Sequence, residues 1–115
     1  MAVIRLQEVV VDCQDPTTLA RFWAELFGTK AVVRDETWAY VDSAKTGVRI
    51  AFQRVPESKS VKNRVHLDVE VDDIPRETER CTHHGARPTG SVMEDDYGQF
   101  QVMLDPEGNE FCLVD

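Results

Sequence analysis

The sequence predicts an α+β fold made of two tandem modules, each with the element order βαβββ. Three observations predict it: short segments alternate apolar and polar residues, two segments carry helix start and stop signals, and the pattern occurs twice. Glu8 and His66 are each followed seven residues later by an aspartate that opens a predicted helix, so the two halves are offset by about 58 residues. We expect residues 1–115 to form one domain, with module one at about 1–55, a linker at 56–62 and module two at about 63–115.

The strands of the first module are predicted from their β-branched and alternating residues. Val3–Asp12 is rich in valine, and its alternation points Glu8 away from Val9 and Val11. Three shorter strands are predicted after the first helix, at Lys30–Arg34, Trp38–Asp42 and Val48–Val55.

The first predicted helix lies between Asp15 and Gly28. Asp15 is a typical N-cap, Pro16 suits the first helical position, and Gly28 supplies a left-handed stop. Its apolar residues fall at spacings of three, four and seven, which indicates one stripe packed on a sheet. These residues are Leu19, Phe22, Trp23 and Leu26.

The second module opens with the alternating stretch Arg64–Asp72, which predicts a strand. Its apolar face is fit to lie under a helix, and its polar face carries side chains close enough to share a metal, a proton or a ligand. The apolar face holds Val65, Leu67, Val69 and Val71. The polar face holds Arg64, His66, Asp68, Glu70 and Asp72.

The rest of the second module repeats the first with a weaker helix. Asp73–His84 resembles the first helix, but its apolar stripe is thin, so we expect it to be short. The turn Asp105–Asn109 precedes the last strand. The remaining predicted strands are Gly90–Glu94, Phe100–Leu104 and Glu110–Val114.

Composition excludes several classes of function. The formal net charge of −8, spread along the chain, opposes binding to nucleic acid. No apolar run is long enough to span a membrane, and the first residues lack the features of a signal peptide, so we expect a cytoplasmic protein. The three cysteines are odd in number and not closely paired, which favours free thiols.

The internal repeat selects the candidate site. Aligning the two halves makes four positions equivalent, and two such halves are expected to converge on one cleft with approximate two-fold symmetry. These positions are Glu8, Ala51, His66 and Cys112. Asp68 shares a strand face with His66 and is placed to hydrogen-bond its imidazole, although a place at the solvent edge fits the pattern equally well.

The sequence resembles the vicinal oxygen chelate superfamily, specifically its small glyoxalase-like domains. The resemblance covers nearly the whole chain. It rests on the paired βαβββ pattern, on Asp15 followed by Phe22-Trp23 and Gly28, on the stretch Arg64–Val69, and on the Asp105–Asn109 turn before the last strand. It implies a curved mixed sheet, a half-barrel around a cleft, with the helices outside.

The resemblance also places the metal-ligand positions of that superfamily at Glu8, Ala51, His66 and Cys112. Glu8 and His66 offer a carboxylate and an imidazole, a set suited to zinc, manganese, nickel or iron. Ala51 cannot bind a metal. Two interpretations of Cys112 remain open: a thiolate that completes a three-ligand site, or a neutral buried thiol.

Other residues are candidates for the same cleft. Gln53 shares a strand face with Ala51, and Gln53 and Asp68 are the candidates to handle protons or orient a substrate. Apolar residues of the inner strands would line the cleft, or serve only as core. They are Trp38, Tyr40, Phe100 and Val102.

Three functions remain open at this point. The first is a metal-dependent lyase, isomerase or dioxygenase acting on a small oxygenated substrate. The second is a metal-free module that binds a small molecule, as antibiotic-sequestering (bleomycin-resistance-like) members of the resembled superfamily do. The third is an interaction domain with a degenerate site. The resemblance also implies a homodimer, which would be isologous.

Overall fold

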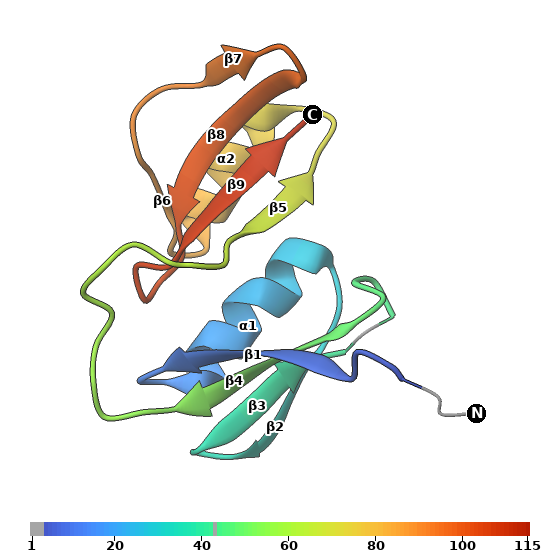
Figure 1. Cartoon of the computed structure of the whole chain (residues 1–115), viewed down its shortest axis with the longest axis vertical. Helices are drawn as coiled ribbons and strands as arrows, with labels where there is room; N and C mark the ends of the chain where they lie inside the picture. Colours follow the sequence, from blue (N-terminus) through green and yellow to red (C-terminus); the bar gives the residue numbers. More distant parts are fainter. Residues whose placement is uncertain (1–3, 43) are drawn as a thin grey trace. The chain divides into compact units, whose positions relative to one another are not determined.

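The computed structural model of the chain describes residues 4–42 and 44–115, which divide into two compact units. The first unit ends at Ser58 and the second begins at Lys59. Each unit has one helix and one mixed sheet of its own (Figure 1). The α+β class with two tandem modules is therefore confirmed.

The first unit has the predicted order βαβββ. Its sheet has the order β1-β4-β3-β2, with β1 parallel to β4 and the other pairs antiparallel. The elements are β1 (Glu8–Cys13), α1 (Pro16–Phe27), β2 (Ala31–Asp35), β3 (Trp38–Val41) and β4 (Arg49–Arg54).

The prediction for β1 was too long at its start. The strand begins at Glu8, where its pairing with Arg49 of β4 begins, and Val3 lies outside the described residues. Ile4 and Leu6 carry no strand assignment, and 92% and 71% of their surface is exposed. The bounds of β2, β3 and β4 lie within one residue of those predicted.

Helix α1 begins and ends as its sequence predicts. The Asp15 carboxylate accepts hydrogen bonds from the Thr18 backbone N–H at 3.2 Å and from the Thr18 hydroxyl at 2.7 Å. Gly28 has the left-handed φ of 68° that ends the helix. The predicted apolar stripe is buried, and α1 contacts β2, β3 and β4.

The second unit contains one more strand than predicted. Its elements are β5 (Leu67–Glu70), α2 (Ile74–His83), β6 (Arg87–Pro88), β7 (Met93–Asp95), β8 (Gly98–Leu104) and β9 (Glu110–Val114). The sheet has the order β5-β9-β8-β6, and β7 pairs with the other end of β8. Helix α2 is short, as expected, and its buried residues are Ile74 and Cys81.

The predicted strand Gly90–Glu94 is confirmed only at Met93 and Glu94, which belong to β7, because the chain leaves the sheet between β6 and β7. Pro88 has no amide hydrogen to donate, and Gly90 has a left-handed φ of 69°, which an extended strand does not allow. The buried Gln101 amide of β8 donates to the carbonyl oxygens of Thr89 and Gly90 at 3.2 and 3.3 Å. One side chain thus replaces part of the missing strand pairing.

Strand β5 is shorter than the predicted Arg64–Asp72. Its ladder begins where Leu67 faces Phe111 of β9. Val65 lies before the strand with 71% of its surface exposed, so its predicted place under a helix was wrong. His66 consequently precedes the strand instead of lying within it.

The strand register confirms the internal repeat. Ala51 pairs with Val10 of β1, and Cys112 pairs with Asp68 of β5, in parallel ladders of the same kind. The alignment of Ala51 with Cys112 therefore holds in the hydrogen-bonded sheets. Within the described ranges, no helix combines the length and the apolar composition needed to cross a membrane.

Candidate functional site

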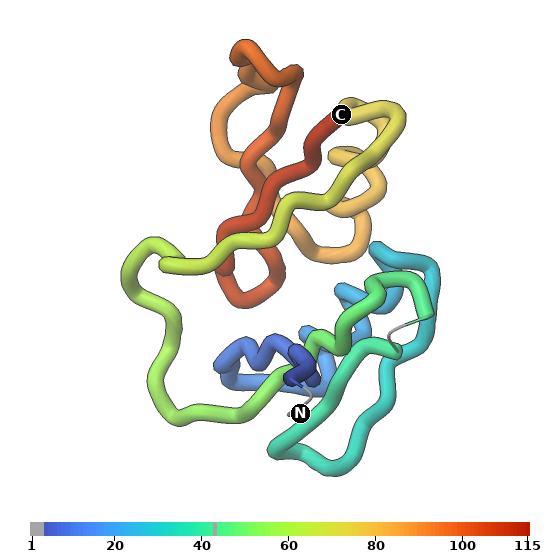
Figure 2. The backbone as a smooth tube through the Cα atoms, turned by 45° about the vertical axis from the view of Figure 1, so that its right-hand side comes forward, coloured from blue at the N-terminus to red at the C-terminus, as the bar shows by residue number. Residues whose placement is uncertain are grey.

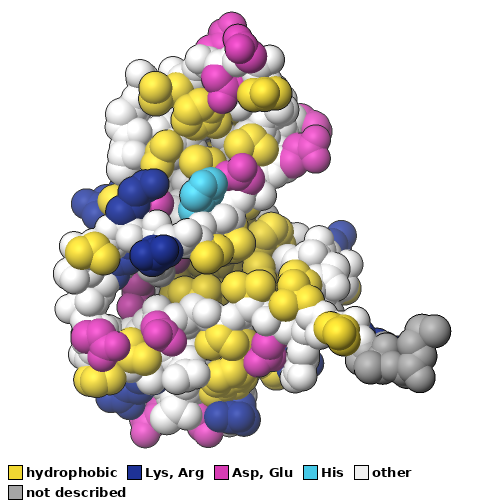
Figure 3. Space-filling model, in the orientation of Figure 1, with side chains coloured by type: hydrophobic (Ala, Val, Ile, Leu, Met, Phe, Trp, Pro, Cys, Tyr) yellow, Lys and Arg dark blue, Asp and Glu magenta, His cyan; other side chains and the backbone are white. Residues whose placement is uncertain are grey.

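An open depression of about 420 Å³ lies on the second unit, over strands β5, β8 and β9. Figure 3 shows hydrophobic and acidic side chains side by side in this part of the molecule, with a histidine beside them. The lining residues are His66, Asp68, Asp95, Tyr97, Gly98, Gln99, Phe100, Cys112, Val114 and Asp115. All of them belong to the second unit.

His66 and Asp68 are in direct contact at the edge of this depression. His66 Nδ1 lies 3.2 Å from Asp68 Oδ1, and about half of each side chain is exposed. The contact that the sequence suggested is therefore present. A carboxylate this close to a ring nitrogen helps to orient the imidazole.

Cys112 lies next to this pair because β9 runs parallel to β5. It pairs with Asp68 in the ladder, and one ligand atom from each of His66, Asp68 and Cys112 lies within 4.8 Å of the others. Burial raises the pKa of the Cys112 thiol, the Asp68 charge raises it further, and Lys62 opposes this weakly. The thiol is therefore neutral at pH 7 without a metal ion.

The three side chains fit a first-row divalent ion. Imidazole nitrogen, carboxylate oxygen and thiolate sulfur are the donors that zinc prefers, and bonds of about 2.0 to 2.3 Å put tetrahedral ligands about 3.5 Å apart. The ligand atoms lie within 4.8 Å of one another, so side-chain rotation would be needed to bring all of them to that spacing. Binding would displace the thiol proton, and three protein ligands leave one position open for water or substrate.

The remaining lining is partly apolar and partly acidic. Phe100 and Val114 face each other in the pairing of β8 with β9 and supply apolar surface. Asp95 and Asp115 supply two more carboxylates, and none of the described lining residues is Lys or Arg. Val102 pairs with Cys112 on the same face but is not a lining residue.

The predicted site residues of the first unit have partners within that unit. The Glu8 carboxylate lies 3.7 Å from the Arg49 guanidinium, which stacks over the Tyr40 ring at 4.0 Å. The Arg34 guanidinium lies 5.2 Å from the centre of the Trp38 ring. Both aromatic residues of this unit that were predicted for the cleft, Trp38 and Tyr40, therefore have an arginine of the same unit against the ring.

Two predicted positions of β4 differ in exposure. Ala51 is fully buried and offers no ligand atom, whereas Gln53 is exposed. Gln53 pairs with Trp38 of β3 and with Asp12 of β1.

Sequence reasoning missed the part of the lining that comes from the β7–β8 hairpin. Glu94, Asp95 and Asp96 are exposed, and Asp95 also lines the depression. Its carboxylate accepts from the Tyr97 backbone N–H at 2.8 Å, which makes a tight turn before Gly98. The Asp-Asp-Tyr-Gly sequence was a usable turn signal.

The remaining histidines and cysteines lie on other elements than the three side chains above. His83 and His84 lie at the C-terminal end of α2, where their rings contact each other at 5.4 Å. Within residues 4–42 and 44–115, Cys13, Cys81 and Cys112 form no disulfide bond. The pKa of Cys81 is raised to about 11 by its burial.

Comparison with known proteins agrees with this architecture. The sequence model of the glyoxalase-like domain family matches residues 8–114. No curated protein matches the chain at a significant level.

Solved structures share the fold at low sequence identity. A glyoxalase/bleomycin resistance protein/dioxygenase family enzyme from Burkholderia phytofirmans superimposes with a TM-score of 0.77 and 21% identity, covering 94% of this chain and 95% of that one. The bleomycin-binding protein of Streptomyces verticillus, solved with copper(II)-bleomycin, superimposes with a TM-score of 0.66 and 20% identity, covering 98% of this chain and 97% of that one. The fosfomycin resistance protein FosX of Listeria monocytogenes superimposes with a TM-score of 0.75 and 13% identity, covering 98% of this chain and 93% of that one.

Proposed function

Because the chain belongs to the glyoxalase-like domain family, we propose that it binds a small oxygenated molecule in the depression of its second unit, at a divalent metal ion held by His66, Asp68 and Cys112. One observation carries the proposal: a nitrogen, an oxygen and a sulfur ligand atom lie within 4.8 Å of one another at the edge of that depression. Glu8, the other metal ligand implied by the resemblance, is paired with Arg49 in the first unit.

The proposed reaction class is a lyase, isomerase or dioxygenase reaction on that molecule. A divalent ion held by these residues would supply Lewis-acid polarisation of the oxygen atoms of the substrate. Phe100 and Val114 would bind the apolar part of the substrate and exclude water from one side. Asp68 would act through its carboxylate as a ligand, and Asp95 is a further carboxylate of the lining that could take a proton.

Calorimetric titration tests the metal site. Zinc, manganese, nickel and iron(II) are titrated in turn into the wild-type protein, His66→Ala and the control His84→Ala, which removes an exposed histidine at the end of α2. We expect one ion to bind the wild type and the control with a Kd below about 10 μM, or roughly 7 kcal/mol of binding free energy. We expect at least tenfold weaker binding to His66→Ala. Equal binding to all three proteins would contradict the proposal.

A second candidate function is metal-free binding of an organic cation with an aromatic body. The observation that favours it is the charge of the lining: carboxylates from Asp68, Asp95 and Asp115, and no Lys or Arg among the described lining residues. Phe100 and Tyr97 offer aromatic surface for a cation. The neutral Cys112 thiol fits an apolar pocket without further change.

Fluorescence titration with a cationic aromatic dye tests the second candidate. We expect saturable binding that a chelator leaves unchanged. The binding should be several-fold weaker in Asp95→Asn. It should be unchanged in the control Asp96→Asn, because Asp96 is not a lining residue. Equal binding of an anionic dye of the same size would contradict it. If neither the ions nor the dyes bind, the third hypothesis, an interaction domain with a degenerate site, is the one that stands.

We further propose that the protein is an isologous homodimer in the cytoplasm. Free thiols are typical of a reducing compartment, and the exposed apolar side chains Val92 and Met93 suit a protein interface. Analytical ultracentrifugation over a range of concentrations tests the dimer. A single monomeric species at high concentration would contradict it.

A further inference from the structure

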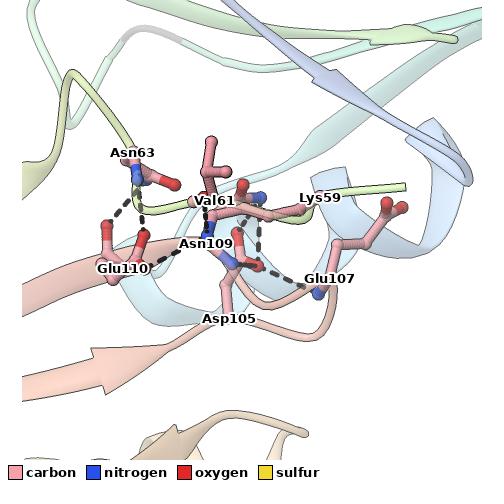
Figure 4. A network of polar contacts seen from close by, with 7 residues as sticks. All are labelled: Lys59, Val61, Asn63, Asp105, Glu107, Asn109 and Glu110. Atoms are coloured by element: carbon pink, nitrogen blue, oxygen red, sulfur yellow. Dashed lines mark hydrogen bonds and ion pairs between the residues drawn. The ribbon is translucent and has the colours of Figure 1, made fainter. Parts of the chain in front are cut away.

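Hydrogen bonds tie the segment Lys59–Asn63 to the first residue of β9. One Glu110 carboxylate oxygen accepts from the Asn63 backbone N–H at 2.9 Å, and the Asn63 side-chain amide donates to the Glu110 carbonyl oxygen at 3.1 Å. The Lys59 ammonium lies 3.1 Å from the other carboxylate oxygen. Figure 4 shows these contacts converging on Glu110.

Glu110 is itself held in place by the turn that precedes it. Only 2% of the surface of Asp105 is exposed. Its carboxylate accepts hydrogen bonds from the backbone N–H groups of Glu107 and Asn109, both at 2.9 Å. The Asn109 side-chain amide donates to the same carboxylate (Figure 4). The contacts of Lys59 and Asn63 with Glu110, called the anchor below, therefore join this segment to a turn that is stabilised by its own hydrogen bonds.

This anchor lies directly before the loop that carries His66. Asn63 is bound to Glu110, and Leu67 pairs with Phe111, the next residue of β9. The three residues between them, 64–66, have no strand pairing and are exposed. In Figure 2 the yellow-green segment that leads into β5 runs beside the red end of the chain in the second unit.

We propose that Glu110 is a positioning residue for His66: it holds the start of the 64–66 loop so that the imidazole stays beside Asp68 and Cys112. The inference rests on the proposed function, which makes His66 a ligand-site residue. The contact of His66 with Asp68 joins two half-exposed side chains, and such contacts contribute little by themselves. The two ends of the loop must therefore supply most of its order.

The test compares Glu110→Ala with Glu110→Gln. The glutamine keeps an oxygen that can accept from the Asn63 N–H, so it should rescue what the alanine loses. Glu57→Ala is the matched control, because Glu57 is an exposed carboxylate just before the anchored segment. Asn63→Ala is a milder variant that removes only the side-chain bond to the Glu110 carbonyl oxygen, and it serves if Glu110→Ala does not fold.

Two measurements need no metal. In hydrogen exchange, the Asn63 amide should be protected in the wild type, Glu110→Gln and Glu57→Ala, and should exchange at least tenfold faster in Glu110→Ala. In nitrogen-15 NMR, the His66 ring should show one dominant tautomer in the wild type, Glu110→Gln and Glu57→Ala. In Glu110→Ala it should show averaged tautomer signals. In Asn63→Ala we expect a smaller change of the same kind.

The third measurement is zinc affinity. It should fall about tenfold in Glu110→Ala and recover in Glu110→Gln, as is usual when a residue that supports a metal ligand is lost. An unchanged His66 tautomer in a folded Glu110→Ala or Asn63→Ala protein would overturn the positioning role. If wild-type protein binds no metal but the tautomer responds as expected, the proposed function fails and the positioning role stands.

Discussion

At the scale of single residues, one carboxylate sets the properties of two neighbours. Asp68 lies 3.2 Å from His66 Nδ1, and its charge adds to the burial that raises the pKa of Cys112. Without a metal ion, the cluster is thus an imidazole, a carboxylate and a neutral thiol. In the proposed metal site, the three side chains would act as ligands only when an ion displaces the thiol proton.

Thiol labelling distinguishes the three cysteines. Cys13 and Cys81 are 3% and 1% exposed, and burial raises the pKa of Cys81 to about 11, whereas Cys112 lies in an open depression. We expect iodoacetamide at pH 8 to modify Cys112 first, with Cys13 and Cys81 modified only on unfolding. Peptide mass spectrometry after timed quenching gives the order. Labelling of Cys81 before Cys112 would be inconsistent with this structure.

The cap of α1 predicts a dependence of stability on pH. The Thr18 hydroxyl and backbone N–H hold the pKa of Asp15 below its ordinary value, which is 3.8. A lowered folded-state pKa stabilises the protein above the unfolded-state pKa, and this contribution is lost as the pH falls through the folded-state pKa.

Asp15→Ala should therefore lower the free energy of unfolding by about 1 kcal/mol at pH 7. The difference from wild type should shrink below about pH 3.8, the ordinary Asp15 value. Urea unfolding of both proteins at several pH values measures this. A difference that stays constant down to the lowest pH would show that the charge of Asp15 plays no part.

At the scale of elements, local signals predicted the helices and failed where a strand depends on its partner. Asp15, Gly28 and Asp73 act within a few residues of themselves, so the sequence alone was enough to predict both helix starts and the end of α1. The extent of β5 depends instead on where β9 offers partners, beginning at Phe111. Alternation alone therefore extended the predicted strand to Arg64.

The gap between β6 and β7 is bridged by Gln101, which has 4% of its surface exposed. Replacing it with leucine leaves the carbonyl oxygens of Thr89 and Gly90 without this donor. Gln101→Leu should therefore lower the free energy of unfolding by about 1 to 3 kcal/mol. Chemical unfolding measures this, and hydrogen exchange in residues 89–92 should become faster.

The control for this prediction is Gln99→Leu, which changes an exposed glutamine on the same strand. It should change the free energy of unfolding by less than about 0.5 kcal/mol. A similar loss in both variants would mean that the Gln101 bonds to the bridging segment do not stabilise it.

At the scale of the whole molecule, the repeat singled out two of the three side chains that lie together at the depression. It aligned Ala51 with Cys112 and Glu8 with His66, and the second-unit members, His66 and Cys112, lie together with Asp68. The pairing of Glu8 with Arg49 could not be foreseen, because it depends on the register of β1 against β4.

The hairpin residues of the lining were also beyond sequence reasoning. Asp95 and Tyr97 reach the depression only because β7 folds back on β8, and the Asp115 carboxylate accepts from the Gln99 N–H at 2.9 Å across two strands. The sequence of the β7–β8 hairpin indicates only a turn with exposed acidic residues, and it does not show which strands these residues contact.

The two units also differ in the size of their cores. Among the described residues, the first unit holds about twice as many buried hydrophobic side chains as the second, and the proposed site belongs to the second. A smaller core leaves more of the second unit open to local fluctuation. Fixed turns and anchors, such as those of Asp105 and Glu110, matter most in such a unit.

The most direct measurement for the proposed site is a cobalt(II) titration followed by absorption spectroscopy, because a cobalt–thiolate bond gives a charge-transfer band that nitrogen and oxygen ligands do not. We predict this band, saturating at one ion per chain, in the wild type and in His84→Ala. We predict its loss in Cys112→Ser and a weaker affinity in His66→Ala. A wild-type protein that binds no cobalt, or a band that survives in Cys112→Ser, would contradict a metal site at His66, Asp68 and Cys112.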